Sequence, residues 1–397
     1  MARINNEPIA VVATAALFSQ AQTPAQFWNN IISGKDFIRE VPASHWLKED
    51  YYHAQVRHPG AVYQTRGSFL EDIAFEPLKY GMPPGEIQST DTAQLLAVIA
   101  ADNLLQATAS ISANKVDTSK ISVMLGVAAG SELMISMSAR IQKPIWQKVL
   151  LHHGLNQQQV TLITDDIACQ HTPWVETTFP GLLANVVSGR VANKLNLGGT
   201  NCTIDAACAS SLAAIKMAID ELRHYDIDLA ISGGVDALND IFMYMCFART
   251  TALSKSGHCL PFAANADGTL LGEGVALFAL RRLSDAQRDN DTIYGVIHGI
   301  GASSDGRGTS VYAPLAKGQA NAIERAYAQT PYSISQTQLI EAHGTGTIAG
   351  DKAEIQGLQL AFKESGKQQS CALGSIKSQI GHTKSTAGAA ALLVPDR

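Results

Sequence analysis

One cysteine in this sequence lies where a thiol could become a nucleophile. Cys208 stands in D-A-A-C-A-S-S-L, at residues 205–212, between a predicted strand and a predicted helix. A thiol in the first turn of a helix lies at the positive end of the helix dipole, which lowers its pKa and raises its thiolate fraction. Backbone N–H groups at that point can also hold an oxyanion. The octet fits a buried cysteine in an Ala- and Ser-rich packing helix equally well, so both interpretations stay open.

A first histidine stands in a glycine-rich turn that follows a predicted strand. His343 lies in E-A-H-G-T-G-T, at residues 341–347. Its ring could act as a base or as a hydrogen-bond donor, and Thr345 and Thr347 could bind a polar chain. A core histidine in a glycine turn is the alternative. No G-K-[ST] follows, which argues against a phosphate-binding loop.

A second histidine ends the segment K-S-Q-I-G-H, at residues 377–382. Lys377 precedes His382 by five residues and could orient the ring or hold a carboxylate. Glu354, in a predicted helix, could pair with Lys377 across the fold. A surface turn without a chemical role is the alternative for this segment.

The three residue types together narrow the chemistry. A cysteine protease needs one histidine and an Asn or Asp that orients it, whereas this chain offers two histidines without a carboxylate in that role. Two neutral imidazoles can donate hydrogen bonds to one thioester oxygen and stabilise an enolate. Cys208, His343 and His382 therefore favour acyl transfer to sulfur, followed by carbon–carbon bond formation.

Predicted strands and helices alternate along the chain and place these residues at strand–helix junctions. Such alternation favours parallel sheets covered by helices. The predicted buried strands are residues 9–13, 121–126, 201–206, 229–233, 275–280, 293–300, 339–342 and 372–375. Helical patterns cover residues 24–33, 93–108, 209–223, 317–328 and 351–362.

One pattern occurs twice and predicts two halves of similar topology. A strand runs into Cys208 and a helix of small residues, and a later strand leads through a turn to His382 and another such helix. We therefore divide the chain into two halves. Residues 1–250 hold the cysteine and an irregular insertion near 36–84, and residues 251–397 hold both histidine motifs.

The composition is that of a globular protein with a large core. Of 397 residues, 46% are hydrophobic and 16% are charged, with a net charge of −5. Because Lys and Arg show neither excess nor clustering, the sequence argues against nucleic-acid binding by phosphate neutralisation. No apolar run reaches the roughly 18 residues that span a bilayer. The six cysteines form no C-x-x-C pair, so we expect no metal site and reduced thiols in a cytoplasm.

Three motifs resemble the active-site motifs of β-ketoacyl synthases. They are D-A-A-C-A-S-S-L, E-A-H-G-T-G-T and S-I-K-S-Q-I-G-H-T-K-S-T-A-G, in the family's order and at family-like separations. The resemblance covers nearly the whole chain. The stretches N-C-T-I-D-A-A-C-A-S-S-L-A-A-I-K-M-A, F-M-Y-M-C-F and G-I-G-A-S-S-D-G-R are most similar to the ketosynthase domain of polyunsaturated-fatty-acid synthases and iterative type I polyketide synthases.

This resemblance implies an α/β thiolase fold, in which two pseudo-repeated halves form a layered αβαβα architecture. It also implies decarboxylative Claisen condensation in fatty-acid or polyketide synthesis. Cys208 would take the acyl chain from the phosphopantetheine of an acyl carrier protein. His343 and His382 would bind the malonyl thioester and stabilise the enolate. Lys377, with Glu354, would organise the histidine pocket.

The resemblance further implies what the chain binds. Thr345 and Thr347 would contact the pantetheine arm of the carrier protein. The family is usually homodimeric, and other synthase domains or subunits are further expected partners. No bound cofactor or metal is expected, because the substrates arrive on phosphopantetheine. The expected location is the cytoplasm.

Two features depart from the family pattern. L-P-F-A stands at residues 260–263, where the family usually has R-P-F-D. The chain stops at Arg397, whereas family members continue with closing strands and a Gly-rich loop that supplies a second oxyanion-hole N–H beside that of Cys208. We therefore expect the C-terminal half to lack its last strands. A truncated, non-catalytic relative that dimerises or binds carrier protein is one alternative. A thiolase is the other, although thiolases carry a second cysteine where this chain has His382.

Overall fold

The computed structural model describes residues 6–56, 58–128, 132–237, 239–308, 310, 312–363 and 371–394. Within them, the main element is a six-stranded sheet with the order β5-β4-β6-β8-β1-β9. Its strands are β1 (Ile9–Phe18), β4 (Ile121–Gly126), β5 (Asn201–Ile204), β6 (Leu229–Asp236), β8 (Gly274–Arg282) and β9 (Gly295–Ile297). One small sheet contains β2 (Arg39–Glu40), β3 (Arg66–Ser68) and β7 (Leu271–Gly272). A second pairs β10 (Leu339–Glu341) with β11 (Ala372–Gly374). Every predicted strand appears; β4 has the predicted bounds, and the others differ at one or both ends.

The six-stranded sheet is mixed, so the expectation of parallel sheets is wrong for it. β4 runs parallel to β5 and β6, but β8 runs antiparallel to both β6 and β1. The chain leaves β6 at Asp236 and enters β8 at Gly274, the register partner of Asp236. Because the chain re-enters the sheet at the end where it left, the returning strand must run in the opposite direction.

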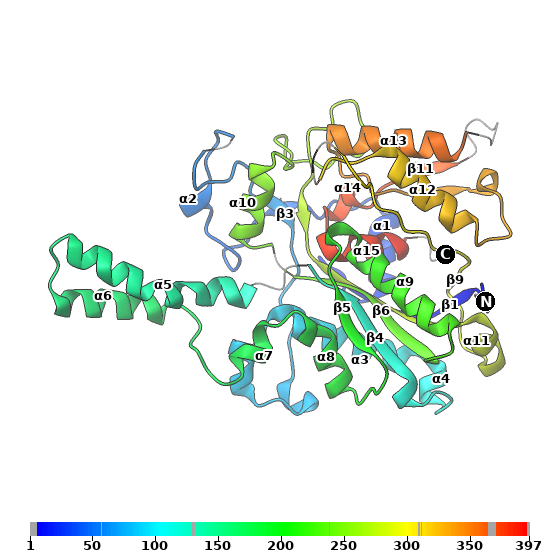
Figure 1. Cartoon of the computed structure of the whole chain (residues 1–397), viewed down its shortest axis with the longest axis horizontal. Helices are drawn as coiled ribbons and strands as arrows, with labels where there is room; N and C mark the ends of the chain where they lie inside the picture. The colour runs from blue at the N-terminus through cyan, green and yellow to red at the C-terminus, as the bar shows by residue number, and fades with distance from the viewer. Residues whose placement is uncertain are drawn as a thin grey trace.

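Helices cover both faces of this sheet (Figure 1). The core on one face includes α3 (Thr92–Ala107) and α8 (Asn185–Lys194), and the core on the other includes α1 (Pro24–Ile32), α9 (Ser210–Arg223) and α15 (Ala387–Leu392). Beyond α9 and α15 lie the β10–β11 sheet and then α12 (Ala316–Tyr327) and α13 (Ile348–Ala361). The layered αβαβα architecture is thereby confirmed.

The remaining helices connect or extend these layers. They are α2 (Lys48–Tyr51), α4 (Ala109–Ser112), α5 (Glu132–His152), α6 (Gln157–Cys169), α7 (Thr178–Leu182), α10 (Ile241–Arg249), α11 (Leu283–Asp289) and α14 (Lys377–Ile380). Segment 36–84 contains β2, α2 and β3 and packs Trp46, Val62 and Phe69 against Tyr244 of α10. The division of the chain near residue 250 stays a prediction.

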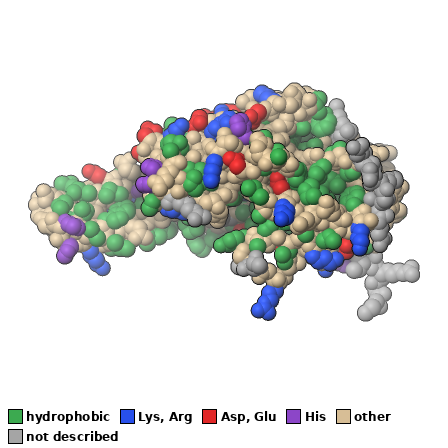
Figure 2. All heavy atoms as spheres, turned by 90° about the horizontal axis from the view of Figure 1, so that it is seen from above, with side chains coloured by type: hydrophobic (Ala, Val, Ile, Leu, Met, Phe, Trp, Pro, Cys, Tyr) green, Lys and Arg blue, Asp and Glu red, His purple; other side chains and the backbone are tan. Residues whose placement is uncertain are grey.

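The α5–α6 hairpin projects from the body of the molecule (Figure 1). Apolar side chains gather on this arm in the space-filling view (Figure 2). Along α5, exposed apolar residues recur at helical spacing, at Met134, Ile141, Ile145 and Val149. Among the residues that the structure describes, no helix is long and apolar enough to cross a membrane. The stripe on α5 is an exposed apolar patch, a feature that often marks an interaction surface.

A buried ion pair fastens β8 to the chain that follows α11. Arg281 Nη1 lies 2.5 Å from Asp291 Oδ2, and the two side chains are 1% and 0% exposed. Asp291 also accepts the N–H of Ser110 at 2.8 Å.

Asp291→Ala leaves that N–H unpaired and leaves the guanidinium of Arg281 with Asp289 alone. We expect a loss of roughly 3 kcal/mol in unfolding free energy, measured by urea denaturation. Asp220→Ala, at an exposed pair on α9, should change it by less than about 1 kcal/mol; equal losses would contradict the prediction.

Candidate active site

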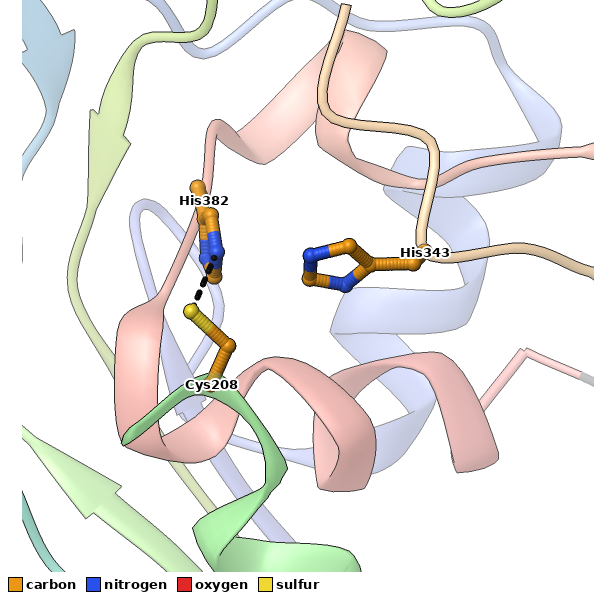
Figure 3. A group of neighbouring side chains, drawn as sticks. All are labelled: Cys208, His343 and His382. Carbon is orange, nitrogen blue, oxygen red and sulfur yellow. Dashed lines mark hydrogen bonds between the residues drawn. The ribbon is translucent and has the colours of Figure 1, made fainter. Parts of the chain in front are cut away.

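Three side chains that are distant in sequence converge at one point (Figure 3). Cys208 comes from the turn before α9, His343 from the loop after β10, and His382 from the turn after α14. Their ligand atoms all lie within 4.8 Å of one another. His382 Nε2 is 3.1 Å from Cys208 Sγ. The juxtaposition expected from the sequence is therefore present.

The turn that presents Cys208 is sharply bent. The preceding residue, Ala207, has a φ of +50°, which lies in the left-handed region that a residue with a Cβ rarely adopts. Its N–H donates to Asp205 Oδ1 at 2.9 Å. Ser210 Oγ accepts the Ala206 N–H at 2.9 Å and donates to the Ala207 carbonyl at 2.6 Å. Two side chains from the same motif thus hold the bend that points the sulfur into the site.

The pKa of the Cys208 thiol is raised, which corrects the expectation of a lowered value. Desolvation by burial is the largest cause, and the charges of Lys377 and Lys384 oppose it. The sequence pattern showed the helix start but not how deeply the sulfur is buried. The resting thiol is therefore protonated at neutral pH, and its reactivity depends on groups that favour the thiolate during the reaction.

A main-chain hydrogen bond determines which ring nitrogen of His382 carries the proton. The Lys384 N–H donates to Nδ1 at 3.0 Å, so Nδ1 is the unprotonated acceptor. The neutral ring then carries its hydrogen on Nε2, the atom that faces Cys208 Sγ. His382 therefore offers the site an N–H donor and not a basic lone pair.

Both imidazoles are neutral at pH 7. Desolvation, with the Lys377 charge, lowers the pKa of His343 to about 3. Burial is also the largest cause that lowers the pKa of His382 well below its ordinary value, and Lys377, His343 and Lys384 add to it. His343 is exposed on the open side of the site, where water weakens its desolvation, but the ordinary value of 6.5 already favours its neutral form. The rings meet edge to face, with centroids 5.3 Å apart (Figure 3).

The loop that carries His343 is anchored by Glu354 on α13. Its two carboxylate oxygens accept the N–H groups of His343 and Gly344, at 2.7 and 2.8 Å. Between the described side chains of Glu354 and Lys377 there is no ion pair within 4 Å, so the contact expected between them is wrong. The sequence placed Glu354 on the correct helix, but only the fold decides that its oxygens reach the main chain.

This anchor makes a specific prediction. Glu354→Gln replaces one accepting oxygen with an NH₂ group, which faces a backbone N–H and cannot accept it. We expect the unfolding free energy to fall by about 2 kcal/mol, as for hydrogen bonds to charged groups, because one N–H loses its partner. Urea denaturation measures this, and Glu324→Gln on the exposed face of α12 is the matched control. Equal stability of the two variants would contradict the anchor.

Thr345 and Thr347 shape the turn after His343. Their hydroxyl oxygens lie 2.9 Å apart, and Thr347 caps α13 by accepting the Gly350 N–H at 3.3 Å. Asp351 accepts the N–H of Gly346 at 3.1 Å. Gly346 has a φ of +74°, which favours glycine. Contact of either threonine with a pantetheine arm stays a prediction.

Lys377, the first residue of α14, lies beneath the site and is 2% exposed. Burial lowers its pKa, and the nearby acidic groups Glu341 and Glu354 oppose this. Its charge lowers the pKa of both histidines and of Cys208. Lys377 therefore influences the pocket through its charge: it favours the thiolate and the neutral imidazoles.

The sequence analysis missed a buried polar group behind His382. Lys384 Nζ lies 2.8 Å from Asp236 Oδ1 and donates to Asn239 Oδ1 at 2.7 Å. Lys384 and Asp236 are only 5% and 4% exposed. The available signal was the polar run T-K-S-T directly after His382, at the start of a helix of small residues, together with an aspartate at the end of a buried strand.

The three converging side chains also form a donor set that a metal ion could use. Cysteine sulfur and histidine nitrogen are both common zinc ligands. A metal-binding histidine usually donates its other ring N–H to an acceptor, whereas His382 Nδ1 accepts a hydrogen bond from Lys384. This tautomer does not suit metal ligation, and the expectation of no metal and no cofactor stays a prediction.

Two family models together match most of the chain. The family model "Beta-ketoacyl synthase, N-terminal domain" matches residues 6–286, and "Beta-ketoacyl synthase, C-terminal domain" matches residues 294–394. The chain is 34% identical to one of the subunits of a polyunsaturated fatty acid synthase from Thraustochytrium sp., over 97% of this chain and 14% of that protein. It is 32% identical to "Polyketide synthase PksN" of Bacillus subtilis, over 98% of this chain and 7% of that protein. The chain thus spans a small part of these relatives.

Solved structures show the same fold. The oxazolomycin ketosynthase domain OzmH KS7 of Streptomyces albus superposes with a TM-score of 0.82 at 27% identity, over 98% of this chain and 61% of that one. The PfaC ketosynthase–chain length factor superposes with a TM-score of 0.85 at 26% identity, over 98% of this chain and 41% of that one. The thiolase fold expected from the sequence is confirmed.

Proposed function

This chain belongs to the β-ketoacyl synthase family, and from that premise we propose that it catalyses decarboxylative Claisen condensation. It joins a malonyl thioester to an acyl chain bound to Cys208, in fatty-acid or polyketide synthesis. The observation that carries this proposal is the convergence of one thiol and two imidazoles within 4.8 Å. A thiolase is not favoured, because the position facing Cys208 is taken by the His382 ring.

The first step loads the acyl chain. The Cys208 sulfur attacks the carbonyl of an acyl thioester on pantetheine, and a new S–C bond forms. The bond from the acyl carbon to the pantetheine sulfur breaks, and the pantetheine leaves as a thiol that carries the former Cys208 proton. The Nε2–H of His382 and the charge of Lys377 favour negative charge on sulfur as the proton departs. This explains how a thiol with a raised pKa can still act as the nucleophile.

The second step uses the same donors on a different atom. Once the sulfur is acylated, His382 Nε2–H and the His343 ring are free to donate to the carbonyl oxygen of a malonyl thioester. The C–C bond to the malonyl carboxylate breaks and CO₂ leaves. The electron pair of that bond forms an enolate, whose oxygen these donors stabilise. The enolate carbon attacks the acyl carbonyl on Cys208, and the C–S bond breaks. Sulfur leaves as a thiolate that takes a proton from solvent, and the 3-ketoacyl thioester leaves the site.

The partners follow from this chemistry. We propose an acyl carrier protein as the donor of both substrates, with Thr345 and Thr347 contacting its pantetheine arm, and no bound cofactor. We also propose a homodimer, because β5 is an edge strand of the large sheet and an unpaired edge can accept a second strand. The exposed stripe on α5 offers apolar area for a further contact between copies. A cytoplasmic location completes the proposal.

The direct test supplies the chain with an acyl carrier protein loaded first with an acyl group and then with malonate. Mass spectrometry of the intact protein should show an acyl adduct on Cys208, followed by CO₂ release and a 3-ketoacyl carrier protein. A folded protein, verified by circular dichroism, that gives neither adduct nor CO₂ would instead favour a non-catalytic module that dimerises or binds carrier protein.

A further inference from the structure

Lys384 has an unusual backbone conformation for a lysine. Its φ is +44°, a left-handed value at which residues with a Cβ are strained. The residue lies two positions after His382, and in this conformation its N–H donates back to His382 Nδ1 at 3.0 Å. The strained residue is therefore the one that selects the tautomer of a histidine in the site.

Buried contacts hold the Lys384 side chain in place. Nζ pairs with Asp236 Oδ1 at 2.8 Å and donates to Asn239 Oδ1 at 2.7 Å and to the Gly272 carbonyl at 2.9 Å. Asp236 Oδ2 accepts both the N–H and the hydroxyl of Ser385, at 3.2 and 2.9 Å. The Lys384–Asp236 pair thus binds two consecutive residues of the turn to the end of β6.

The main chain of His382 is fixed from the other side. Its N–H donates to the Leu270 carbonyl at 2.7 Å, and its carbonyl accepts the Gly272 N–H at 3.0 Å. The same Gly272 accepts Lys384 Nζ through its own carbonyl. His382 is therefore held between the segment of β7 and the end of β6, and Lys384 connects the two.

We propose that Lys384, paired with Asp236, is a positioning residue that keeps His382 in the tautomer presenting Nε2–H to the substrate. The inference rests on the condensation proposed above. Stability alone does not explain the pair, because burying an ion pair costs desolvation energy, and apolar residues of similar volume often stabilise a fold as well. What distinguishes this pair is that its lysine contacts the ring through its own N–H.

The charge of Lys384 acts in the same direction. The charged and titratable groups around the His382 ring are Lys384 and Asp236 behind it and Lys377, His343 and Cys208 in the site. Burial and the two lysines lower the pKa of His382. Removing the Lys384 charge should therefore raise that pKa toward its ordinary value.

Two variants at position 384 separate the turn from the charge. Lys384→Ala removes the side-chain contacts and keeps the strain of a Cβ at this φ, whereas Lys384→Gly removes the same contacts and relieves the strain. Both leave Asp236 without its cation to the same extent. A difference between them therefore reports on the turn that carries the N–H.

The first readout is the His382 tautomer in protein labelled with ¹⁵N-histidine, with its signals assigned by their loss in His382→Gln. The wild type should show the Nε2–H form. Lys384→Ala should shift the ring toward Nδ1–H, and Lys384→Gly should keep more of the wild-type form. This readout needs no activity, so it remains decisive if the proposed condensation fails.

The second readout is malonyl decarboxylation. Lys384→Ala should lower kcat on the order of 10²-fold through misplacement of the ring, with KM for the malonyl thioester changed by less than about 3-fold. Cys208 acylation should also slow, because loading uses the same Nε2–H and the Lys384 charge favours the thiolate. As the pH is lowered, the activity of Lys384→Ala should begin to decline at a higher pH than that of the wild type, because the neutral His382 ring is required and its pKa is raised in the variant. Lys216→Ala, at an exposed pair on α9, is the matched control.

Two results would overturn the inference. One is an unchanged tautomer and kcat in Lys384→Ala. The other is an equal loss of activity in Lys384→Ala and Lys384→Gly with unshifted tautomer and pH profile, which would indicate a purely structural pair. If Lys384→Ala does not fold, Lys384→Gln, which removes the charge but keeps a polar side chain, takes its place, and a smaller shift toward Nδ1–H relative to the wild type is expected.

Discussion

Cys208→Ala should abolish covalent acyl loading and condensation while malonyl decarboxylation continues. The variant has no sulfur to attack the acyl thioester, so we expect condensation to fall at least about 10⁴-fold, as for other lost nucleophiles. In the proposed mechanism, decarboxylation uses the Nε2–H of His382 and the His343 ring, which the substitution leaves in place. The loss of loading without loss of decarboxylation would separate the two steps.

Intact-protein mass spectrometry and CO₂ release measure the two halves of this prediction. Cys169→Ala is the matched control, because Cys169 is an exposed free thiol at the end of α6. It should load acyl chain like the wild type. An acyl adduct that persists in Cys208→Ala, or one that disappears in Cys169→Ala, would mean that the nucleophile has been assigned to the wrong thiol.

His343→Ala should give the opposite pattern. It removes one donor to the developing enolate oxygen, and a lost oxyanion donor costs on the order of 10²–10³ in rate. Loading of Cys208 should remain within a few-fold of wild type, because the hydrogen-bond partner of the sulfur is His382 and not His343. His343→Gln, whose amide can still donate, should recover part of the decarboxylation.

The control for this series is His152→Ala, at the exposed end of α5. It should match the wild type in both steps. If His343→Ala lost loading and decarboxylation equally, the ring would act on the acyl chain or on folding and not on the enolate. If it lost neither, His382 alone would supply the donor.

The acid side of the pH profile follows from the same groups. Burial lowers the pKa of His382 well below its ordinary value, whereas the exposed His343 ring is less fully desolvated. If neutral His382 is the main donor, decarboxylation should stay level as the pH falls from 8 through 6.5, where ordinary histidines gain a proton. A decline centred near pH 6.5, measured with malonyl carrier protein and corrected for unfolding, would show that one of the rings titrates normally.

Local sequence was sufficient to predict the strands and the three candidate catalytic residues. Short buried runs and glycine turns bring Cys208, His343 and His382 to strand–helix junctions, since each signal lies within about ten consecutive residues. These same motifs were sufficient to identify the family and its layered fold. The expected pairing of Glu354 with Lys377 was wrong, because a carboxylate on a helix has several neighbours within reach and only packing selects one.

Tertiary structure alone decided the properties that depend on distant partners. The direction of β8 depends on where the chain returns to the sheet, opposite Asp236. The raised pKa of Cys208 depends on burial by several elements. Lys384 meets Asp236, which lies 148 positions earlier in the sequence, and that contact helps to determine which His382 nitrogen carries a proton. Charge, burial and tautomer are sums over neighbours in space, and a linear pattern of residues does not contain them.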